Sequence, residues 1–300
     1  MTPNWGIIGH QNIVSYLQNC LQKNRLVHAY LFYGVRHLGK TTITLKFAEE
    51  LLSKSSGPHL DLFELKLEEG KKDIGIDQVR DWQHWLTLKS FGKGYKVGII
   101  HQVENLNIQS ANALLKTIEE PTAKTVLILI TSAWEQLLPT IISRSQKIHF
   151  LPVKTKEIEK AVSYQISDKK KVRDIVSFSL GRPGLALRFC EDQEFFKEYS
   201  QLHQKVSDLL GLHLAQRFEF LGMFLNGKDL RENIIKAQIF LQHLEFILRN
   251  RLLAKYKLTN QQSIEPKVLV SQLDLLSKTK LILKNNVQPR LALENLLINI

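Results

Sequence analysis

The stretch Tyr30-Leu31-Phe32-Tyr33, followed directly by Gly34-Val35-Arg36-His37-Leu38-Gly39-Lys40-Thr41, decides the fold of the first half of this chain. It places the pattern G-x-x-x-x-G-K-[ST] between a short apolar strand and a helix, which is the context in which this pattern forms a phosphate-binding loop. The glycines let backbone N–H groups curl around phosphate oxygens, and the helix N-terminus adds positive potential. The stretch therefore predicts an α/β domain with a nucleotide site.

The loop also predicts the residues that hold the nucleotide. We expect ATP to be bound, with Mg²⁺, by Gly34, Gly39, Lys40, Thr41 and Thr42. In such loops the lysine reaches the β- and γ-phosphates and the following hydroxyl binds Mg²⁺. A loop that keeps its fold and has lost its ligand is the alternative, because Arg36 and His37 are bulky for this turn.

Outward from the loop, the first half alternates apolar strands with amphipathic helices. Further strands are expected at residues 96–100, 125–131 and 147–150, and their near-continuous apolar runs are typical of a parallel sheet buried on both faces. After Pro152 the sequence favours helices alone, including 154–166, 169–180 and 185–198, and later a long one with Leu241, Leu244 and Leu248 at helical spacing. Loops are expected at 226–229, with Asp229 as a helix cap, and at 260–266. We predict an α/β domain over 1–152, a small helical domain over 153–198 and a helical bundle over 199–300.

The strand at 96–100 should also supply the carboxylates that hold Mg²⁺ and orient the attacking water. It runs instead into His101 and Gln102, while Glu104 falls in what we expect to be the next turn. Mg²⁺ prefers hard oxygen ligands, and an amide cannot accept a proton from water. The sequence therefore predicts nucleotide binding with little or no hydrolysis.

Composition excludes several classes of protein. Hydrophobic residues make up 44% of the 300 residues and charged residues 23%, which is ordinary for a globular chain and not for a disordered one. The apolar runs are far shorter than the roughly 20 residues that a bilayer requires, and no secretory signal precedes residue 5, so we expect a cytoplasmic protein. The two cysteines exclude a disulfide framework. The net charge of +12 suits a polyanionic partner such as nucleic acid, or solubility alone.

A series of motifs resembles the subunits of the bacterial DNA polymerase III clamp loader, which are AAA+ proteins. They are, in chain order, Ile7–Gln11, Arg25–Phe32, Ile76–Arg80, Tyr95–Val97, Asn112–Pro121 and Leu137–Gln146. The segment at 76–80 resembles the family's linker before its second strand. The resemblance implies a P-loop domain, a helical lid domain and a C-terminal collar. It also implies that the chain helps to load a sliding clamp onto primed DNA during replication, without crossing or binding a membrane.

The resemblance further implies roles for individual residues. Ser143-Arg144-Ser145 matches the family's Ser-Arg-Cys motif, so Arg144 would act as an arginine finger in the nucleotide site of an adjacent subunit; an arginine that forms a salt bridge within its own domain is the alternative. Thr131 matches a polar group near the γ-phosphate, or else caps a turn. Gly184 stands where hydrolysing relatives usually carry an arginine of the lid. The implied partners are gamma/tau-like and delta-like subunits, the clamp indirectly, and primed DNA in the assembled complex, which Lys116 could meet.

One departure from the family is large, and two rival interpretations of the sequence stay open. Members of the family commonly carry a four-cysteine zinc module where residues 53–61 stand, and because this segment has no cysteine we predict no zinc. An active AAA+ ATPase motor would need the carboxylates that positions 101 and 102 lack. A small-molecule phosphotransferase would need an acceptor pocket that nothing in the sequence indicates.

Overall fold

A computed structural model describes residues 5–52, 60–91, 94–122, 124–257, 266–283 and 287–300. The chain divides into two compact units, Met1–Glu191 and Asp192–Ile300. The segments at 53–59, where the zinc module is expected to be missing, and at 258–265, which covers most of the loop predicted over 260–266, lie outside the described residues.

The N-terminal unit is built on a five-stranded sheet with the order β2-β3-β4-β1-β5, in which every neighbouring pair is parallel. The strands are β1 (Ala29–Tyr33), β2 (Leu62–Leu65), β3 (Lys96–Ile100), β4 (Thr125–Thr131) and β5 (Gln146–His149). Every residue of β3 and β4 is buried, as expected for central strands of a parallel sheet that is covered on both faces. The predicted parallel α/β sheet is confirmed.

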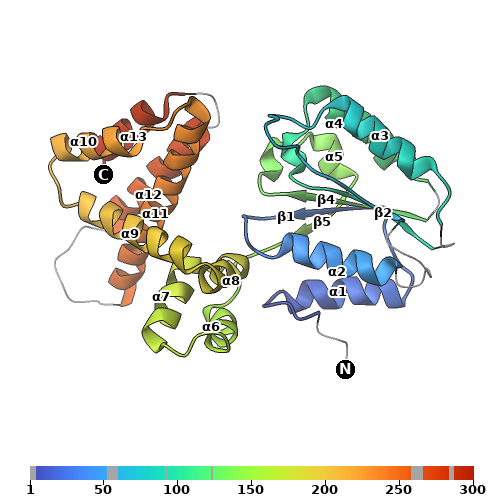
Figure 1. Cartoon of the computed structure of the whole chain (residues 1–300), viewed down its shortest axis with the longest axis horizontal. Helices are drawn as coiled ribbons and strands as arrows, with labels where there is room; N and C mark the ends of the chain where they lie inside the picture. The colour runs from blue at the N-terminus through green and yellow to red at the C-terminus, as the bar shows by residue number, and fades with distance from the viewer. Residues whose placement is uncertain (1–4, 53–59, 92–93, 123, 258–265, 284–286) are drawn as a thin grey trace. The chain divides into compact units, whose positions relative to one another are not determined.

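Helices cover both faces of this sheet (Figure 1). One face carries α1 (Gln11–Gln22) and α2 (Lys40–Leu52), and the other carries α3 (Ile76–Thr87), α4 (Ile108–Glu119) and α5 (Pro139–Ser143), with short 3-10 turns at Val103–Asn105 (η1) and Trp134–Gln136 (η2). Because strand side chains alternate in direction, Phe32 packs into the core on the α2 side, with Phe47. Its neighbour Leu31 packs on the other side, with Trp82 and Leu114.

Three details of the chain up to residue 198 differ from the sequence predictions. β2 was not predicted, because a strand of four residues that includes Glu64 gives almost no apolar pattern. Residues 76–80, which resemble a linker, are the start of α3, the helix that buries Val79 and Trp82. The helix predicted over 185–198 is two helices, since Asp192 ends one and caps the next through a hydrogen bond from Phe195 N, 2.9 Å long.

A group of three short helices follows the sheet within the same unit. These are α6 (Thr155–Ser163), α7 (Lys169–Ser179) and α8 (Pro183–Glu191). Asp168 caps α7 by accepting from the amides of Lys170 and Lys171, at 2.8 and 3.3 Å. Gly181 follows α7 with φ +75°, and an added Cβ there would lie 2.7 Å from Pro152. This close approach packs the turn between α7 and α8 against the chain that leaves the sheet.

The C-terminal unit is helical throughout its described residues. It consists of α9 (Gln193–Leu209), α10 (Leu214–Phe224), α11 (Leu230–Lys257), α12 (Pro266–Ile282) and α13 (Pro289–Ile298). The long α11 packs against α9, α12 and α13. Its Leu241, Leu244 and Leu248 are fully buried, so the leucines at helical spacing form the core of this unit.

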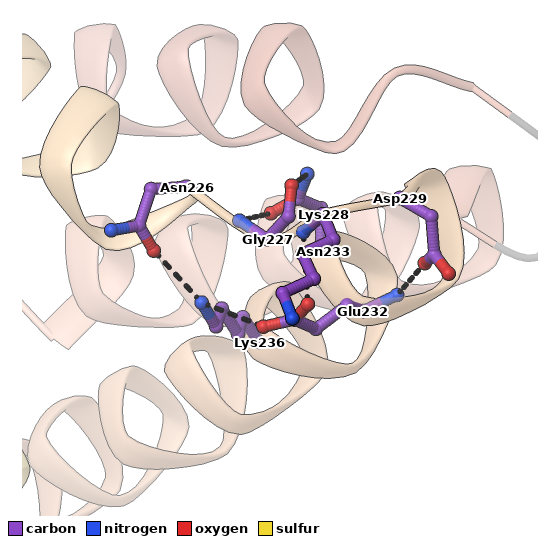
Figure 2. Close-up of polar contacts among 7 residues, drawn as sticks. All are labelled: Asn226, Gly227, Lys228, Asp229, Glu232, Asn233 and Lys236. Carbon is purple, nitrogen blue, oxygen red and sulfur yellow. Dashed lines mark hydrogen bonds and ion pairs between the residues drawn. The ribbon is translucent and has the colours of Figure 1, made fainter.

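The start of α11 shows how sequence sets a helix boundary (Figure 2). Asp229 accepts a hydrogen bond from the backbone N–H of Glu232 at 2.8 Å, which confirms the predicted cap. Asn233 accepts from Gly227 N at 2.8 Å, and Lys236 donates to Asn226 at 2.9 Å, so side chains of the first turns hold the preceding loop.

No helix among the residues that the structure describes combines the length and the apolar character needed to cross a membrane.

Candidate functional site

The phosphate loop leaves the carboxyl end of β1 and opens α2, as predicted. Gly34 has φ +140°, and a Cβ added there would lie 2.4 Å from the carbonyl oxygen of Phe150, so the position requires glycine. Gly39 has φ +89° immediately before α2 begins at Lys40. His37 adopts φ +66°, an uncommon conformation for a residue with a side chain. The backbone therefore forms the turn that the motif predicts.

Lys40 is turned back onto the loop itself. Its Nζ donates to the carbonyl oxygens of Gly34 at 2.6 Å and Val35 at 2.8 Å, and the residue is only 7% exposed. The pKa of this ammonium group is lowered to about 8, chiefly by burial; the charge of Glu104 opposes the shift and the nearby positive charge of Arg36 adds to it. Lys40 must exchange these carbonyl partners to reach a phosphate group.

The hydroxyl residues of the site lie in two places. Thr41 and Thr42 are exposed on the first turn of α2. Thr131 ends β4 directly opposite Tyr33 of β1 and is buried, and its Oγ1 accepts from the N–H of Ala133 at 3.0 Å. The turn-capping contact is thus present, and the hydroxyl hydrogen of Thr131 can still be donated.

The end of β3 carries a histidine–carboxylate pair in the position where Mg²⁺ would be held. His101 Nε2 lies 2.7 Å from Oε2 of Glu64 on the neighbouring β2, and Lys66 lies 2.9 Å from the same carboxylate. Burial lowers the pKa of His101 despite Glu64, so near neutral pH the imidazole is uncharged and donates a hydrogen bond. Glu64 was missed by the sequence analysis because its strand was missed.

These side chains do not fit Mg²⁺ well. Gln102 is exposed, and the carboxylate of Glu64 already has two partners, so the strand end offers no ready oxygen anion for a hard cation. Across the described parts of the chain, no three His, Cys, Asp or Glu side chains cluster as a metal ion would need.

Glu104 is the carboxylate whose charge acts on Lys40 of the phosphate loop. It lies in η1, as expected for a residue past the strand, and its Oε1 accepts from Ser132 N at 3.2 Å and Ser132 Oγ at 2.8 Å. Its Oε2 is buried without a hydrogen-bond partner among the described residues, and its charge favours the protonated form of Lys40. Only the spacing of two residues beyond Gln102 could have indicated this contact.

The three-helix group contributes backbone to the loop. The N–H of Gly184 donates to the carbonyl oxygen of His37 at 2.9 Å. Arg182 donates through Nε to Ser179 O at 3.0 Å, so its side chain is partly committed to its own turn. Burial first, and then the charges of Arg182 and Arg188, lower the pKa of His37. The surroundings of the loop are therefore strongly cationic.

Arg144 is not part of this loop site. It directly follows α5, its side chain is 42% exposed, and its Nε lies 2.8 Å from Oε1 of Glu119 at the end of α4. The serines beside it bond within α5, since Ser143 Oγ donates to Thr140 O at 3.1 Å and Ser145 Oγ to Ile141 O at 2.8 Å. The structure thus brings Gly34, Gly39, Lys40 and the start of α2 together and leaves Arg144 on the surface.

Comparisons with known proteins agree with this architecture. Residues 9–154 match the family described as DNA polymerase III, delta subunit. A DNA polymerase III subunit delta' of Pseudomonas aeruginosa is 32% identical over 207 residues, which cover 63% of this chain and 63% of the relative. A DNA polymerase III subunit gamma of Buchnera aphidicola is 27% identical over 281 residues, covering 86% of this chain and 75% of the relative. The chain thus spans less than two thirds of the first of these relatives.

Solved structures were also compared with the chain. The gamma subunit-related protein of Thermotoga maritima has 22% sequence identity and a TM-score of 0.49, over 94% of this chain and 97% of that one. The predicted class, α/β with a parallel sheet around a phosphate loop followed by helical regions, is the AAA+ fold and is confirmed. The chain is therefore similar to subunits of the DNA polymerase III clamp loader, most clearly over residues 9–154.

Proposed function

We propose that this chain is a delta-prime-like subunit of the clamp loader, one that supplies Arg144 to a neighbouring ATPase subunit and hydrolyses little or no ATP itself. The observation that carries the proposal is a contrast between two places in one chain. Arg144, directly after the short helix α5, has an exposed guanidinium group. The chain's own strand end carries His101 and Gln102 where hydrolysis needs carboxylates.

The geometry of the loop supports weak binding or none. Lys40 is occupied by Gly34 O and Val35 O, and its lowered pKa makes it a weaker cation than an exposed lysine. Oε1 of Glu104 is held by Ser132, and its Oε2, which has no hydrogen-bond partner among the described residues, is buried away from solvent. Exposed Thr41 and Thr42 leave the first turn of α2 open to a phosphate group. Nucleotide would therefore serve as a structural ligand at most.

The proposed partners follow from the family. They are gamma/tau-like and delta-like subunits, the sliding clamp indirectly, and primed DNA in the assembled complex. Within this chain α4 is the element that suits contact with DNA, since Asn107 caps its start by accepting from Ser110 N at 2.8 Å and Lys116 is exposed on its surface. Such contacts with phosphate position a protein on a duplex without reading its sequence. The domains proposed for these roles are a P-loop domain over 1–152, a lid over 153–198 and a collar over 199–300.

The test is ATP hydrolysis by the host's other loader subunits, with clamp and primed DNA, in the presence of this chain or its variants. We expect the wild type to stimulate hydrolysis and Arg144→Ala to lose most of the stimulation, because an arginine finger contributes about 10³–10⁵ in rate. Arg144→Lys should also fail, since an ammonium group lacks the planar fork. Lys147→Ala, which removes a nearby exposed cation from β5, is the matched control and should behave as wild type.

Two results would overturn the proposal. Equal stimulation of hydrolysis by the wild type and by Arg144→Ala would show that Arg144 does not act as an arginine finger. A turnover near one per second by this chain alone at saturating MgATP, abolished by Lys40→Ala, would favour the active AAA+ motor instead.

A further inference from the structure

The contact between Arg144 and Glu119 joins the ends of two helices at the surface. Arg144 Nε lies 2.8 Å from Glu119 Oε1, and the two side chains are 42% and 45% exposed. Ion pairs between groups this exposed contribute little to stability, because water already solvates both charges well. The importance of the pair must therefore lie in geometry.

The nitrogen that makes the contact matters. A guanidinium group presents five N–H donors, four of them on its two terminal nitrogens. The ion pair with Glu119 lies at Nε, and in the described structure the side chain of Arg144 has no hydrogen bond and no other ion pair. Its terminal fork is thus left for a planar or tetrahedral oxyanion, which such a fork binds in a bidentate manner.

Both ends of the pair are held by rigid elements. Glu119 is the last residue of α4, whose Leu114 and Ile118 are buried in the core. The same helix is tied to α3, since Gln83 Nε2 donates to Ala113 O at 2.9 Å and to Thr117 Oγ1 at 2.6 Å.

The arginine end is fixed in a similar way. Ile141 of α5 is buried, and the buried Ser145 donates to its carbonyl oxygen at 2.8 Å, which holds the backbone on both sides of Arg144. A long side chain on a fixed backbone still samples many rotamers, and one contact at Nε selects a small set of them.

We propose that Glu119 is a positioning residue, which holds Nε of Arg144 so that the terminal nitrogens face outward and receive a phosphate group of the nucleotide in the adjacent subunit. This inference rests on the function proposed above. A positioned finger loses less rotamer freedom when it binds, and small errors in the placement of a reacting group are costly in rate.

Glu120 provides a matched control within the same chain. It is the next residue, it is also exposed, and no hydrogen bond or ion pair of its side chain occurs in the described structure. Glu119→Ala and Glu120→Ala change the net charge equally, so a difference between them reports the contact and not long-range electrostatics.

The experiment measures stimulated ATP hydrolysis with these variants. We expect Glu119→Ala to lower kcat about tenfold with the KM for ATP unchanged, within the range that small misplacements cost. Glu119→Asp should recover part of the rate and Glu120→Ala all of it. In the Arg144→Ala background, Glu119→Ala should have no further effect, because the two residues act as one unit.

A second readout does not depend on the partner subunits. In ¹⁵N-labelled protein, the Nε–H resonance of Arg144 should have the same chemical shift in wild type and in Glu120→Ala, and a different one in Glu119→Ala. Equal kcat values for Glu119→Ala and Glu120→Ala, or additive losses with Arg144→Ala, would overturn the proposal for Glu119. If Arg144→Ala itself has no effect, the proposed function fails first, so the two failures are distinguishable.

Discussion

Lys40 shows how burial changes the chemistry of one residue. The lysine of a phosphate loop is usually regarded as a permanent cation, yet here two carbonyl oxygens hold it inside the loop and burial brings its pKa to about 8. A bound phosphate group would favour the charged form and raise this pKa again. Ligand binding and proton binding are therefore linked at this residue.

The first prediction follows from that linkage. The pKa of Lys40 is lowered to about 8 in the ligand-free chain, and a phosphate group favours the charged lysine. The affinity for ADP should therefore be highest below about pH 8, where Lys40 is already charged, and should fall as the pH rises above it. At pH 8 about half of the Lys40 side chains are uncharged, so ADP binding should take up about half a proton per chain. His37 should not contribute to this uptake, because its lowered pKa leaves it neutral at pH 8.

Calorimetry in two buffers of different ionisation enthalpy measures this uptake, with Lys46→Met as the control for an exposed lysine. Heats that show no dependence on the buffer would contradict the linkage. The absence of binding would favour the loop that has lost its ligand.

Single residues also set how much of the site could be predicted. Gly34, Gly39 and Lys40 could be placed from the motif alone, because their roles are properties of a local turn. Glu64 could not, because its relation to His101 depends on which strands are neighbours in the sheet, and β2 lies beside β3 only through tertiary contacts.

The same contrast holds for helices and strands: those set by local sequence could be predicted, and those that depend on tertiary contacts could not. β4 could be predicted, since seven consecutive apolar or β-branched residues have few alternatives. Residues 76–80 resemble a linker, yet they begin α3, whose buried Val79, Trp82 and Leu86 follow helical spacing. The polar residues between them hid the signal, and the contact with Phe63 O through Trp82 Nε1, at 3.3 Å, could not be known from sequence.

The second prediction concerns the start of α11. Asp229→Ala removes the acceptor for Glu232 N and should lower the free energy of unfolding by about 1 kcal/mol, the usual value of an N-cap. Asp229→Asn keeps an acceptor and should change the stability by a few tenths of a kcal/mol at most.

Urea denaturation followed by circular dichroism measures both variants. As a control, Asp274→Ala, which breaks an exposed pair with Lys278, should cost no more than about 0.5 kcal/mol. If Asp274→Ala were as costly as Asp229→Ala, the loss would reflect general surface charge and not the cap.

At the scale of the whole molecule, basic residues outnumber acidic ones, 41 against 29. The net charge of +12 is sufficient for attraction to DNA, while a specific DNA site cannot be read from it. The third prediction is that this chain alone binds primed DNA weakly, with affinity falling at least about tenfold between 50 and 200 mM salt. Lys116→Ala on α4 should reduce the slope of log affinity against log salt by about one.

Fluorescence anisotropy of labelled DNA over a salt series measures this slope. Lys278→Ala, an exposed lysine on α12, serves as the control. Nanomolar binding that does not vary with salt would contradict an electrostatic contact.

The hydrogen bond from Gly184 to the phosphate loop has a consequence for the history of such a chain. A Cβ at position 184 would lie 3.0 Å from the carbonyl oxygen of His37, closer than side chains normally approach a backbone. Acquiring an arginine there would first require the loop to move, and the loop is also fixed by His10, whose Nε2 lies 2.8 Å from Leu38 O. No single substitution could therefore rebuild an active ATPase site, because the carboxylates at 101 and 102 would have to appear as well. A return to an independent motor would thus take several substitutions together with a small shift of the loop.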